Sequence, residues 1–280
     1  MATLAENRYG KSRVRVMKVV RHETHHAMKE WSVRVLLHGD FESCFTAGDN
    51  SKILPTDTMK NTVYYLARES NASTLEAFAI ELVEYLLANN PQVTKASAEI
   101  EEKSWKQMLI DGTPHPTTYQ LNGPELQTAV ASLERGNSVL ISSGVDGLVI
   151  LKTTKSAFTG YIKDKLTTLP ESTDRIFGTR ATAVWGYAAP PQDYEATRAT
   201  ALATLLKVFA EHDSLSVQHT LFDIGQAMLE AVPTMARVKL TMPNLHSNLV
   251  DLSRFGQTNP NQIFVPIDEP HGYIEAVIER

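Results

Sequence analysis

The stretch Pro55-Thr56-Asp57-Thr58-Met59-Lys60-Asn61-Thr62 marks the point at which the first half of this chain changes from strands to helices. Its polar residues lead into Val63, Leu66 and Ala67, which fall at helical spacing and predict an amphipathic helix. Thr56 follows a proline and precedes an aspartate, so it is placed to cap that helix. Because a helix start presents free backbone N–H groups and partial positive charge, the same place suits an anionic ligand.

Strands are predicted on both sides of this region. Residues 13–20 alternate loosely, and a strand is also expected over 41–46. The clearest strand carries large apolar side chains at alternate positions: Trp31, Val33, Val35 and Leu37. A second helix is predicted from the capping box Ser73-Thr74-Leu75-Glu76 to the stop signal Asn89-Asn90-Pro91. Strands over 93–105 and 126–142 complete the first half.

The second half repeats this order. Strands are predicted over 148–153 and 181–187, then two helices, then strands over 238–241 and 249–252. The first helix follows Pro190-Pro191, and the second carries apolar residues at helical spacing: Val217, Leu221, Ile224 and Met228. An insertion over 154–180 predicts a surface loop with a short helix that includes 173–176.

The strand-strand-helix-helix-strand-strand plan, found twice, predicts an α+β fold of two units. Each unit would form an antiparallel sheet with a helix pair on one face. The expected units are 8–143 and 144–280, because Gly144, Asp146 and Gly147 interrupt the pattern between them.

Composition excludes several classes of protein. A net charge of −5, with scattered Lys and Arg, argues against nucleic-acid binding. The single Cys44 excludes an intrachain disulfide and any cysteine metal cluster. The chain has no apolar run of about 18 residues that would span a membrane. It also lacks an N-terminal signal-peptide core and a peroxisomal C-terminus, so we expect a cytoplasmic protein.

One metal-like motif is present, but its surroundings do not suit a metal. His22-Glu23-Thr24-His25-His26 matches the zinc-protease pattern, which needs both histidines on one face of a buried helix. Here it lies between two predicted strands, which indicates an exposed hairpin loop. The nine histidines form no clear metal set, and the glycine-rich nucleotide motifs and the nucleophile elbow are absent. We therefore expect no metal and no cofactor, and look to the side chains for the chemistry.

Several short motifs taken together resemble those of the urate oxidases (uricases). Each alone has an ordinary structural interpretation, such as a surface Lys, a packed Phe or an exposed Gln. The matching stretches, in order, are Tyr9-Gly10-Lys11, Thr56-Asp57 with Lys60-Asn61-Thr62, Phe158 before Gly160, Asp174-Arg175-Ile176, Ser216-Val217-Gln218, and Pro243-Asn244 with His246. The similarity runs from about residue 8 to residue 279.

The resemblance implies a fold, an assembly and a reaction. The fold would be the tunnelling fold, with two tandem ββααββ units per chain and four chains forming a tunnel-shaped homotetramer. The reaction would be the oxidation of urate by O₂ to 5-hydroxyisourate and hydrogen peroxide, without a cofactor. The active sites would lie at subunit interfaces.

The resemblance also assigns a substrate-binding role to seven residues. Phe158 would stack on the flat purine, Arg175 would grip one edge of the urate anion, and Gln218 would pair with the opposite edge. The other substrate-binding residues are Thr56, Asp57 and Val217, the last two through their backbone N–H groups, and Asn244, which would lie above the ring where O₂ or water binds.

The catalytic residues implied by the resemblance are Lys11, Thr56 and His246, which would form a proton relay. In this relay the Thr hydroxyl is the shuttle, Lys is the base or its partner, and His is the orienting end. Lys11 and Thr56 are expected from one subunit and the remaining groups from its neighbour.

The chain departs from the family pattern beside His246. Leu245 stands where many relatives have Lys, and Ser247-Asn248 replace a bulkier pair. These changes leave open a urate- or purine-binding scaffold with little turnover. A third alternative is a zinc-dependent pterin enzyme of the same fold superfamily, prompted by His22 and His26.

Overall fold

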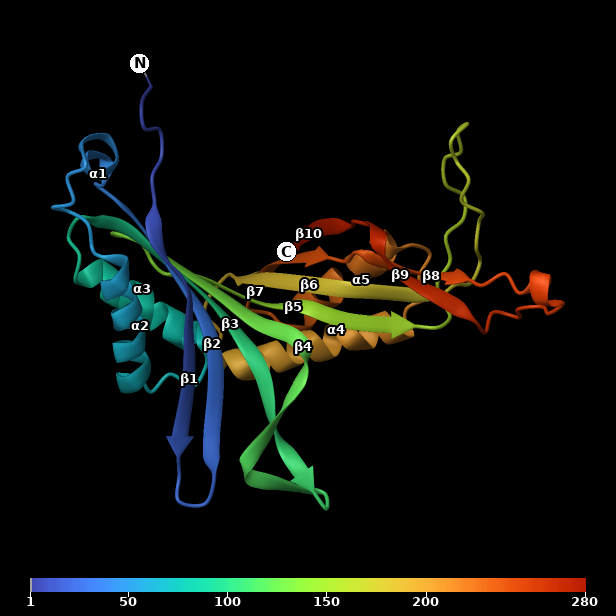
Figure 1. Ribbon diagram of the computed structural model, residues 1–280, viewed down its shortest axis with the longest axis horizontal. Coiled ribbons are helices and arrows are strands. Elements are labelled where there is room, and N and C mark those ends of the chain that lie inside the picture. The colour runs from blue at the N-terminus through green and yellow to red at the C-terminus, as the bar shows by residue number, and fades with distance from the viewer. Residues whose placement is uncertain (1) are drawn as a thin grey trace. The chain divides into compact units, whose positions relative to one another are not determined.

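Groups of strands and groups of helices alternate along the computed structural model, which describes residues 2–280 (Figure 1). Tertiary contacts divide these residues into two units after Gly144. The first unit holds β1 (Tyr9–Arg21), β2 (His26–Gly39), α1 (Glu42–Ala47), α2 (Thr56–Glu69), α3 (Leu75–Ala88), β3 (Val93–Ile110), β4 (Thr113–Glu134) and the start of β5 (Leu140–Lys152). The second holds the rest of β5, β6 (Phe177–Tyr187), α4 (Tyr194–Glu211), α5 (Val217–Ala231), β7 (Met235–Thr241), β8 (Asn244–Leu249), the 3₁₀ turn η1 (Ser253–Phe255), β9 (Phe264–Gly272) and β10 (Glu275–Glu279).

The sheet of the first unit has the order β1-β2-β3-β4, with antiparallel neighbours. Its inner face carries the alternating side chains of β2, so Trp31 is 1% exposed and Val33 is fully buried. The helices α2 and α3 cover this face, and Phe78 of α3 stacks on Trp31 with ring centres 4.7 Å apart. The period-two apolar pattern therefore sets which face of the sheet the helices occupy.

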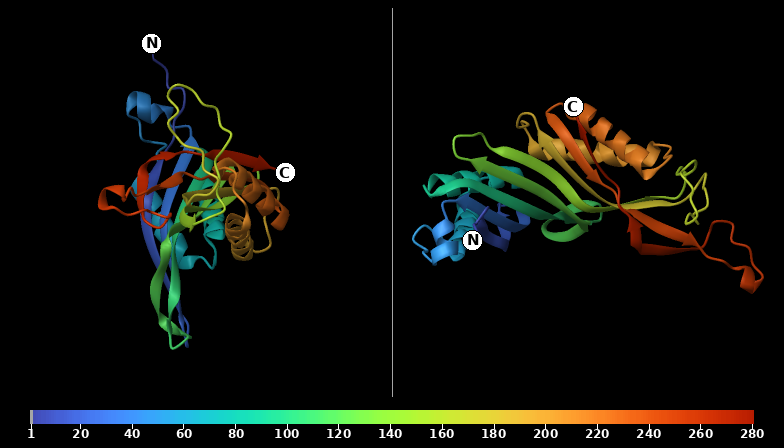
Figure 2. Two further views of the ribbon diagram at one scale, coloured as in Figure 1. Left: turned by 90° about the vertical axis from the view of Figure 1, so that its right-hand side faces the viewer. Right: turned by 90° about the horizontal axis from the view of Figure 1, so that it is seen from above.

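The second unit repeats this arrangement with additional strands. Its sheet runs β5-β6-β7-β10, and β8 pairs with both β6 and β9. The helices α4 and α5 supply the apolar side chains that pack on it, including Leu205, Phe209 and Ile224. The loop between β5 and β6, yellow-green in Figures 1 and 2, projects as a long hairpin from the end of these strands.

The predicted α+β class and the doubled strand-helix plan are confirmed. The loop at His22–His26 is also confirmed, because β1 ends at Arg21 and β2 begins at His26, with His22 and His25 exposed. None of the helices within residues 2–280 has the length and apolarity of a membrane span.

Three element predictions in the first unit are wrong. Residues 41–46 form most of α1 instead of a strand, because Phe41 is buried edge-on against Tyr9 and turns the chain into a short helix. The single strand predicted over 126–142 is two strands, separated by a turn in which Gly136 has φ 87°. The predicted interruption near Gly144 is absent, since β5 runs through it without a break.

Two helix caps are shifted by one residue. Pro55 occupies the cap position of α2 without a side-chain hydrogen bond, and Thr56 is the first helical residue. Thr74 caps α3 by accepting a hydrogen bond from the N–H of Ala77. Both shifts leave the helices where they were predicted.

The remaining errors lie in the second unit. The insertion between β5 and β6 contains no helix, and 173–176 is not helical but leads into β6. The strand expected over 249–252 instead ends at Leu249 as β8. The strands β9 and β10 were not predicted.

Candidate functional site

A pocket of about 680 Å³ in the second unit gathers four of the residues singled out from the sequence. It lies between the long loop before β6 and the strand β8, and it is lined by Phe158, Arg175, Asn244 and His246. A larger groove of about 810 Å³ lies between β1 and α2, but none of the singled-out residues lines it. The smaller pocket, called the Arg175 pocket below, is therefore the candidate site.

The loop is held in shape by backbone hydrogen bonds on both sides of Phe158. Phe158 exchanges two of them with Ser172, at 2.7 and 3.1 Å between nitrogen and oxygen. The N–H of Ala157 donates to the carbonyl of Ser214 at 2.7 Å, which ties the loop to the turn before α5. Phe158 is thus placed by a short ladder and not by a helix.

Asp174 organises the other end of the loop. Its carboxylate accepts a hydrogen bond from Thr154 Oγ1 at 2.8 Å. That bond, together with bonds from the backbone N–H groups of Ser156, Lys155 and Arg175, lowers the pKa of Asp174. Because the carboxylate gathers these donors in an extended segment, residues 173–176 do not continue as a helix.

Arg175 lines the pocket half-buried, and its guanidinium has no hydrogen-bond partner in the described part of the chain. Its guanidinium carbon is 5.3 Å from the centre of the Phe158 ring. Its Nε is buried and makes no hydrogen bond, and no acidic group pairs with Arg175 among residues 2–280. A buried donor left unpaired costs about 1–3 kcal/mol. Burial also lowers the pKa of Arg175. A planar anion that accepts two hydrogen bonds would satisfy this group.

Phe158 forms part of a ring stack beside the arginine. Tyr161 lies parallel to it, with ring centres 4.8 Å apart and planes 14° apart. One face of the Phe158 ring is therefore covered by Tyr161, and a flat ligand would have to use the other face. Parallel stacking of this kind suits planar conjugated rings.

His246 and Asn244 enter the pocket from β8. Burial is the main cause of the lowered pKa of His246, and the charge of Arg175 and the nearby His271 act in the same direction. The imidazole is consequently neutral at pH 7 and able to take up a proton. Ser247 and Asn248, the residues that depart from the family pattern, line the same pocket, whereas Leu245 pairs with Gly178 of β6.

Lys11, Thr56 and Asp57 lie in the first unit. Tyr9 links their two segments, because its hydroxyl donates to the carbonyl of Leu54 and accepts from the N–H of the same residue. Lys11 precedes a shift in the β1–β2 register, and Thr56 begins α2. Neither Lys11 Nζ nor Thr56 Oγ1 has a hydrogen-bond partner in the described part of the chain.

Asp57 is engaged on its own helix. Its carboxylate binds Lys60 and Asn61, and the hydrogen bond from Lys60 is the main cause of its lowered pKa, with a smaller contribution from Lys11. Its side chain is thus occupied, and only its backbone N–H, in the first turn of α2, is free for a ligand.

Val217 and Gln218 begin α5 but do not line the Arg175 pocket. Ser216 caps this helix by accepting a hydrogen bond from the N–H of His219 at 3.1 Å. The backbone N–H groups of Val217 and Gln218 have no partner within the helix, as in any first turn. The structure therefore brings Phe158, Arg175, Asn244 and His246 together and leaves Val217 and Gln218 outside that set.

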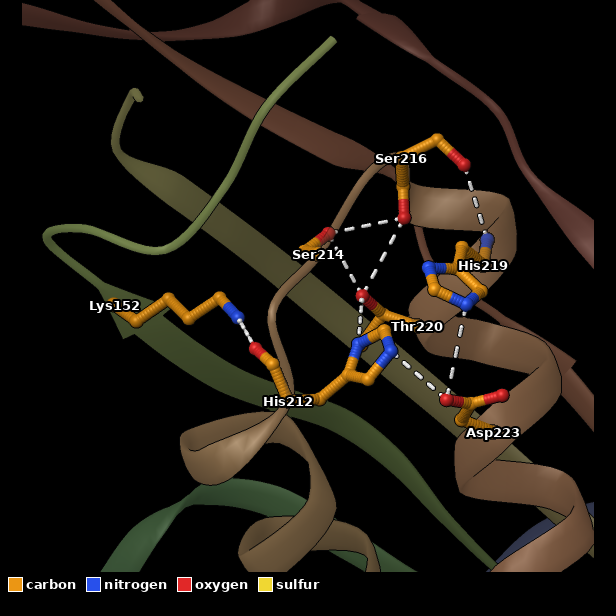
Figure 3. A network of polar contacts seen from close by, with 7 residues as sticks. All are labelled: Lys152, His212, Ser214, Ser216, His219, Thr220 and Asp223. Carbon is orange, nitrogen blue, oxygen red and sulfur yellow. Dashed lines mark hydrogen bonds and ion pairs between the residues drawn. The ribbon is translucent and has the colours of Figure 1, made fainter. Parts of the chain in front are cut away.

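Two features of the second unit were missed from the sequence. One is the anchoring role of Asp174. The other is a cluster of His212, His219 and Asp223 at the junction of α4 and α5 (Figure 3). The four-residue spacing of His219 and Asp223 is a sequence signal that places both side chains on one helix face, but His212 joins them only through the turn between the helices.

Comparisons with known proteins agree along the whole chain. A family model described as Uricase matches residues 7–132 and 141–275. The uricase of Arthrobacter globiformis is 40% identical over 277 residues, covering 99% of this chain and 90% of that protein. The uricase of Dictyostelium discoideum is 38% identical and covers 100% of this chain and 98% of that protein.

Solved structures give the same result for the fold. The crystal structure of the Arthrobacter globiformis uricase matches with a TM-score of 0.94 at 40% identity, covering 100% of this chain and 96% of that one. The crystal structure of a uricase from Bacillus fastidious matches with a TM-score of 0.84 at 24% identity, which supports the fold alone.

Proposed function

Since the chain belongs to the uricase family, we propose that it oxidises urate with O₂ and water to 5-hydroxyisourate and hydrogen peroxide. Two electrons leave urate and reduce O₂ to the peroxide level, and the oxygen of water becomes the new hydroxyl group. One observation within the site carries this proposal: a half-buried arginine whose buried Nε has no protein partner, beside an aromatic ring in a pocket.

Arg175 would hold the urate anion by one edge. Its planar fork matches two acceptors that lie side by side, which a Lys ammonium would not do. Phe158 would hold the flat ring of the purine through the face that Tyr161 leaves open. Edge and face contacts together would fix the plane of the substrate.

Gln218 and the backbone N–H of Val217 would contact the opposite edge of urate. They begin α5, and the hydrogen bond from Ala157 to Ser214 holds the Phe158 loop next to the turn before this helix. The amide of Gln218 offers both a donor and an acceptor, which suits an edge that presents both. The backbone N–H of Asp57 would add a donor from the first unit.

Lys11, Thr56 and His246 would move the protons. The Thr56 hydroxyl, which has no described partner, would pass a proton between substrate or water and Lys11. His246, neutral because its pKa is lowered, would orient the relay and accept a proton at its far end. General base catalysis of this kind contributes about 10²–10⁴-fold to rate. Asn244 would hold O₂ or water above the ring.

Urate itself would supply the electrons. Ground-state O₂ is a triplet, so a direct two-electron attack is spin-forbidden. A urate dianion is electron-rich enough to transfer one electron at a time, so the protein has to remove a proton, hold the anion and confine O₂. Holding the two reactants together adds an entropic advantage.

We also propose that the complete site forms between subunits of a homotetramer. The relay groups Lys11 and Thr56 belong to the first unit, whereas the Arg175 pocket is lined entirely by the second. In this arrangement the first unit of one subunit would complete the pocket of its neighbour.

Oxygen uptake measured together with the loss of urate absorbance tests the function. The purified chain, treated with a chelator, should consume one O₂ per urate and release one hydrogen peroxide. Tight urate binding without oxygen uptake would instead favour the scaffold alternative, which the small Ser247 and Asn248 beside His246 support. Activity lost on chelation and restored by zinc would favour the pterin-enzyme alternative.

A further inference from the structure

We propose that His212, His219 and Asp223 form a binding site for a divalent transition metal such as Zn²⁺, separate from the Arg175 pocket. One ligand atom from each of the three side chains lies within 4.8 Å of the others. His212 directly follows the last residue of α4, and His219 and Asp223 lie one helical turn apart on α5 (Figure 3). Two imidazoles and one carboxylate are a common protein ligand set for zinc, with water as a further ligand.

A directed chain of hydrogen bonds holds the ring of His212. Ser214 Oγ donates to the carbonyl of Ser216 at 3.0 Å, and Thr220 Oγ1 donates to Ser214 Oγ at 2.8 Å. Thr220 Oγ1 also lies 3.1 Å from His212 Nδ1, and it accepts a hydrogen bond from that nitrogen when Nδ1 carries the ring proton. Thr220 is fully buried, so no water competes for this contact.

Nε2 of His212 is the ring nitrogen that faces Asp223. With Nδ1 protonated, the neutral ring presents the lone pair of Nε2, which lies 2.8 Å from Asp223 Oδ2. A lone pair and a carboxylate oxygen at that distance repel each other unless a cation lies between them. A proton on Nε2 or a metal ion between the two atoms would satisfy the pair.

The spacing of the three ligand atoms suits a metal after a small adjustment. In a tetrahedral site, zinc–ligand bonds of about 2.0–2.1 Å place neighbouring ligand atoms about 3.3 Å apart. The two nitrogen-to-Asp223 distances, 2.8 Å for His212 and 3.9 Å for His219, lie on either side of that value. The hydrogen bond on Nδ1 of His212 is the outer contact that orients a metal-binding imidazole.

Exposure and charge also suit an ion that enters from solvent. The side chain of His212 is 15% exposed, whereas those of His219 and Asp223 are 42% and 37% exposed. The rim is therefore open for the ion and its waters. Among the other nearby charges, Lys152 donates to the carbonyl of His212 at 2.6 Å, and Asp213 offsets its charge.

Metal binding would link the end of α4 to the first turns of α5. The turn between them, residues 213–216, would then be closed by the ion. Ligands that bind only the folded state raise its stability by mass action. At a hundredfold excess over the dissociation constant, the unfolding temperature should rise by about 5 °C.

The test uses the full-length protein, stripped of metal by a chelator and titrated with Zn²⁺ and, separately, Co²⁺. We expect one Zn²⁺ retained per chain after dialysis at pH 7.5, a visible d–d band for bound Co²⁺, and the rise in unfolding temperature. Binding should weaken below pH 6, because the imidazoles must be deprotonated.

Variants locate the ion. His219→Ala and Asp223→Asn change partly exposed side chains, and each should weaken Zn²⁺ binding at least tenfold and remove the cobalt band. The matched control is the pair His22→Ala and His25→Ala, whose stacked rings at the β1–β2 turn are the alternative histidine pair. In that control the binding should be unchanged. Absence of saturable binding in the unaltered chain, or binding that survives both test variants, would overturn the proposal.

Discussion

Replacing Arg175 by Met should weaken substrate binding while leaving the fold as stable or more stable. Met keeps the length and apolar contacts of the side chain but removes the charge and the fork. Two charge-assisted hydrogen bonds to the substrate, each worth about 1.5 kcal/mol or more, would be lost. Because about 1.4 kcal/mol corresponds to a factor of ten, a loss of about 3 kcal/mol weakens binding about 150-fold.

The effect on folding should have the opposite sign. The buried Nε of Arg175 has no partner, and removing it relieves about 1–3 kcal/mol of desolvation. Loss of the contact with the Phe158 ring, 5.3 Å from the guanidinium carbon, offsets about 0.5–1 kcal/mol of that gain. The net expectation is a free energy of unfolding higher by about 1 kcal/mol.

Two measurements separate these effects. Equilibrium binding of a non-reacting urate analogue gives the change in affinity, and urea unfolding of the unliganded protein gives the change in stability. Arg180→Met is the matched control, because Arg180 is exposed on β6 five residues further on. Affinity within threefold of the unaltered protein, or a stability loss of more than about 1 kcal/mol, would refute the assignment of Arg175 as an unsatisfied ligand-binding group.

Three further predictions concern the relay, the titration of the pocket and the fold. Lys11→Met should lower turnover about 10²–10⁴-fold and leave the binding of a urate analogue unchanged. Mixed tetramers of Lys11→Met and Arg175→Met chains should regain part of the activity. Unchanged turnover in Lys11→Met would contradict the relay, and no recovery in verified mixed tetramers would contradict a site shared between subunits. Because the pKa of His246 is lowered in the folded protein, the unfolded chain binds a proton at this residue more readily. The contribution of His246 to the free energy of unfolding is therefore complete above about pH 6.5 and is lost as the pH falls further. The free energy of unfolding, measured with urea, should differ less between pH 7.5 and pH 5.5 in His246→Gln than in the unaltered protein. An equal difference would show that His246 is not the cause of the pH dependence. Gly10→Ala would place a Cβ 1.9 Å from a carbonyl oxygen of β2, so it should lower the free energy of unfolding by about 1–3 kcal/mol. Gly186→Ala is the control, because its new Cβ would meet only a flexible side chain at 3.4 Å and should change the free energy of unfolding less.

Local periodicity was sufficient to predict most of the fold. The alternation from Trp31 to Leu37 identified β2 because one face of this strand is fully buried, and the helices α2 and α3 followed from their apolar spacing. The strand β8 and its partner β9 are different. Their residues are partly or largely exposed, so no period-two burial marks them, and their pairing depends on contacts that the sequence does not state.

The errors at α1 and at 173–176 share a physical cause. In both places one side chain makes a nonlocal contact that overrides the local preference of the backbone. Phe41 packs on Tyr9, far away in the sequence, and Asp174 accepts hydrogen bonds from the Thr154 hydroxyl and from backbone N–H groups. Local propensity carries no information about such contacts, whereas the family resemblance named four residues that line the Arg175 pocket and two, Val217 and Gln218, that do not.

The two sites differ in how their polar groups are satisfied, and this difference bears on what each is for. The hydroxyl groups of Thr74 and Ser216 accept hydrogen bonds from backbone N–H groups at the start of their own helices, so the fold explains these side chains. Arg175 is not, because its buried Nε has no partner, and the 2.8 Å contact between His212 Nε2 and Asp223 needs a proton or a metal ion between the two atoms. Folding alone would remove such arrangements, because apolar or self-paired residues would be more stable at the same positions. Under the two proposals above, a planar anion would supply the partner of Arg175 and a metal ion would replace the proton between His212 and Asp223, so each ligand would stabilise the folded chain.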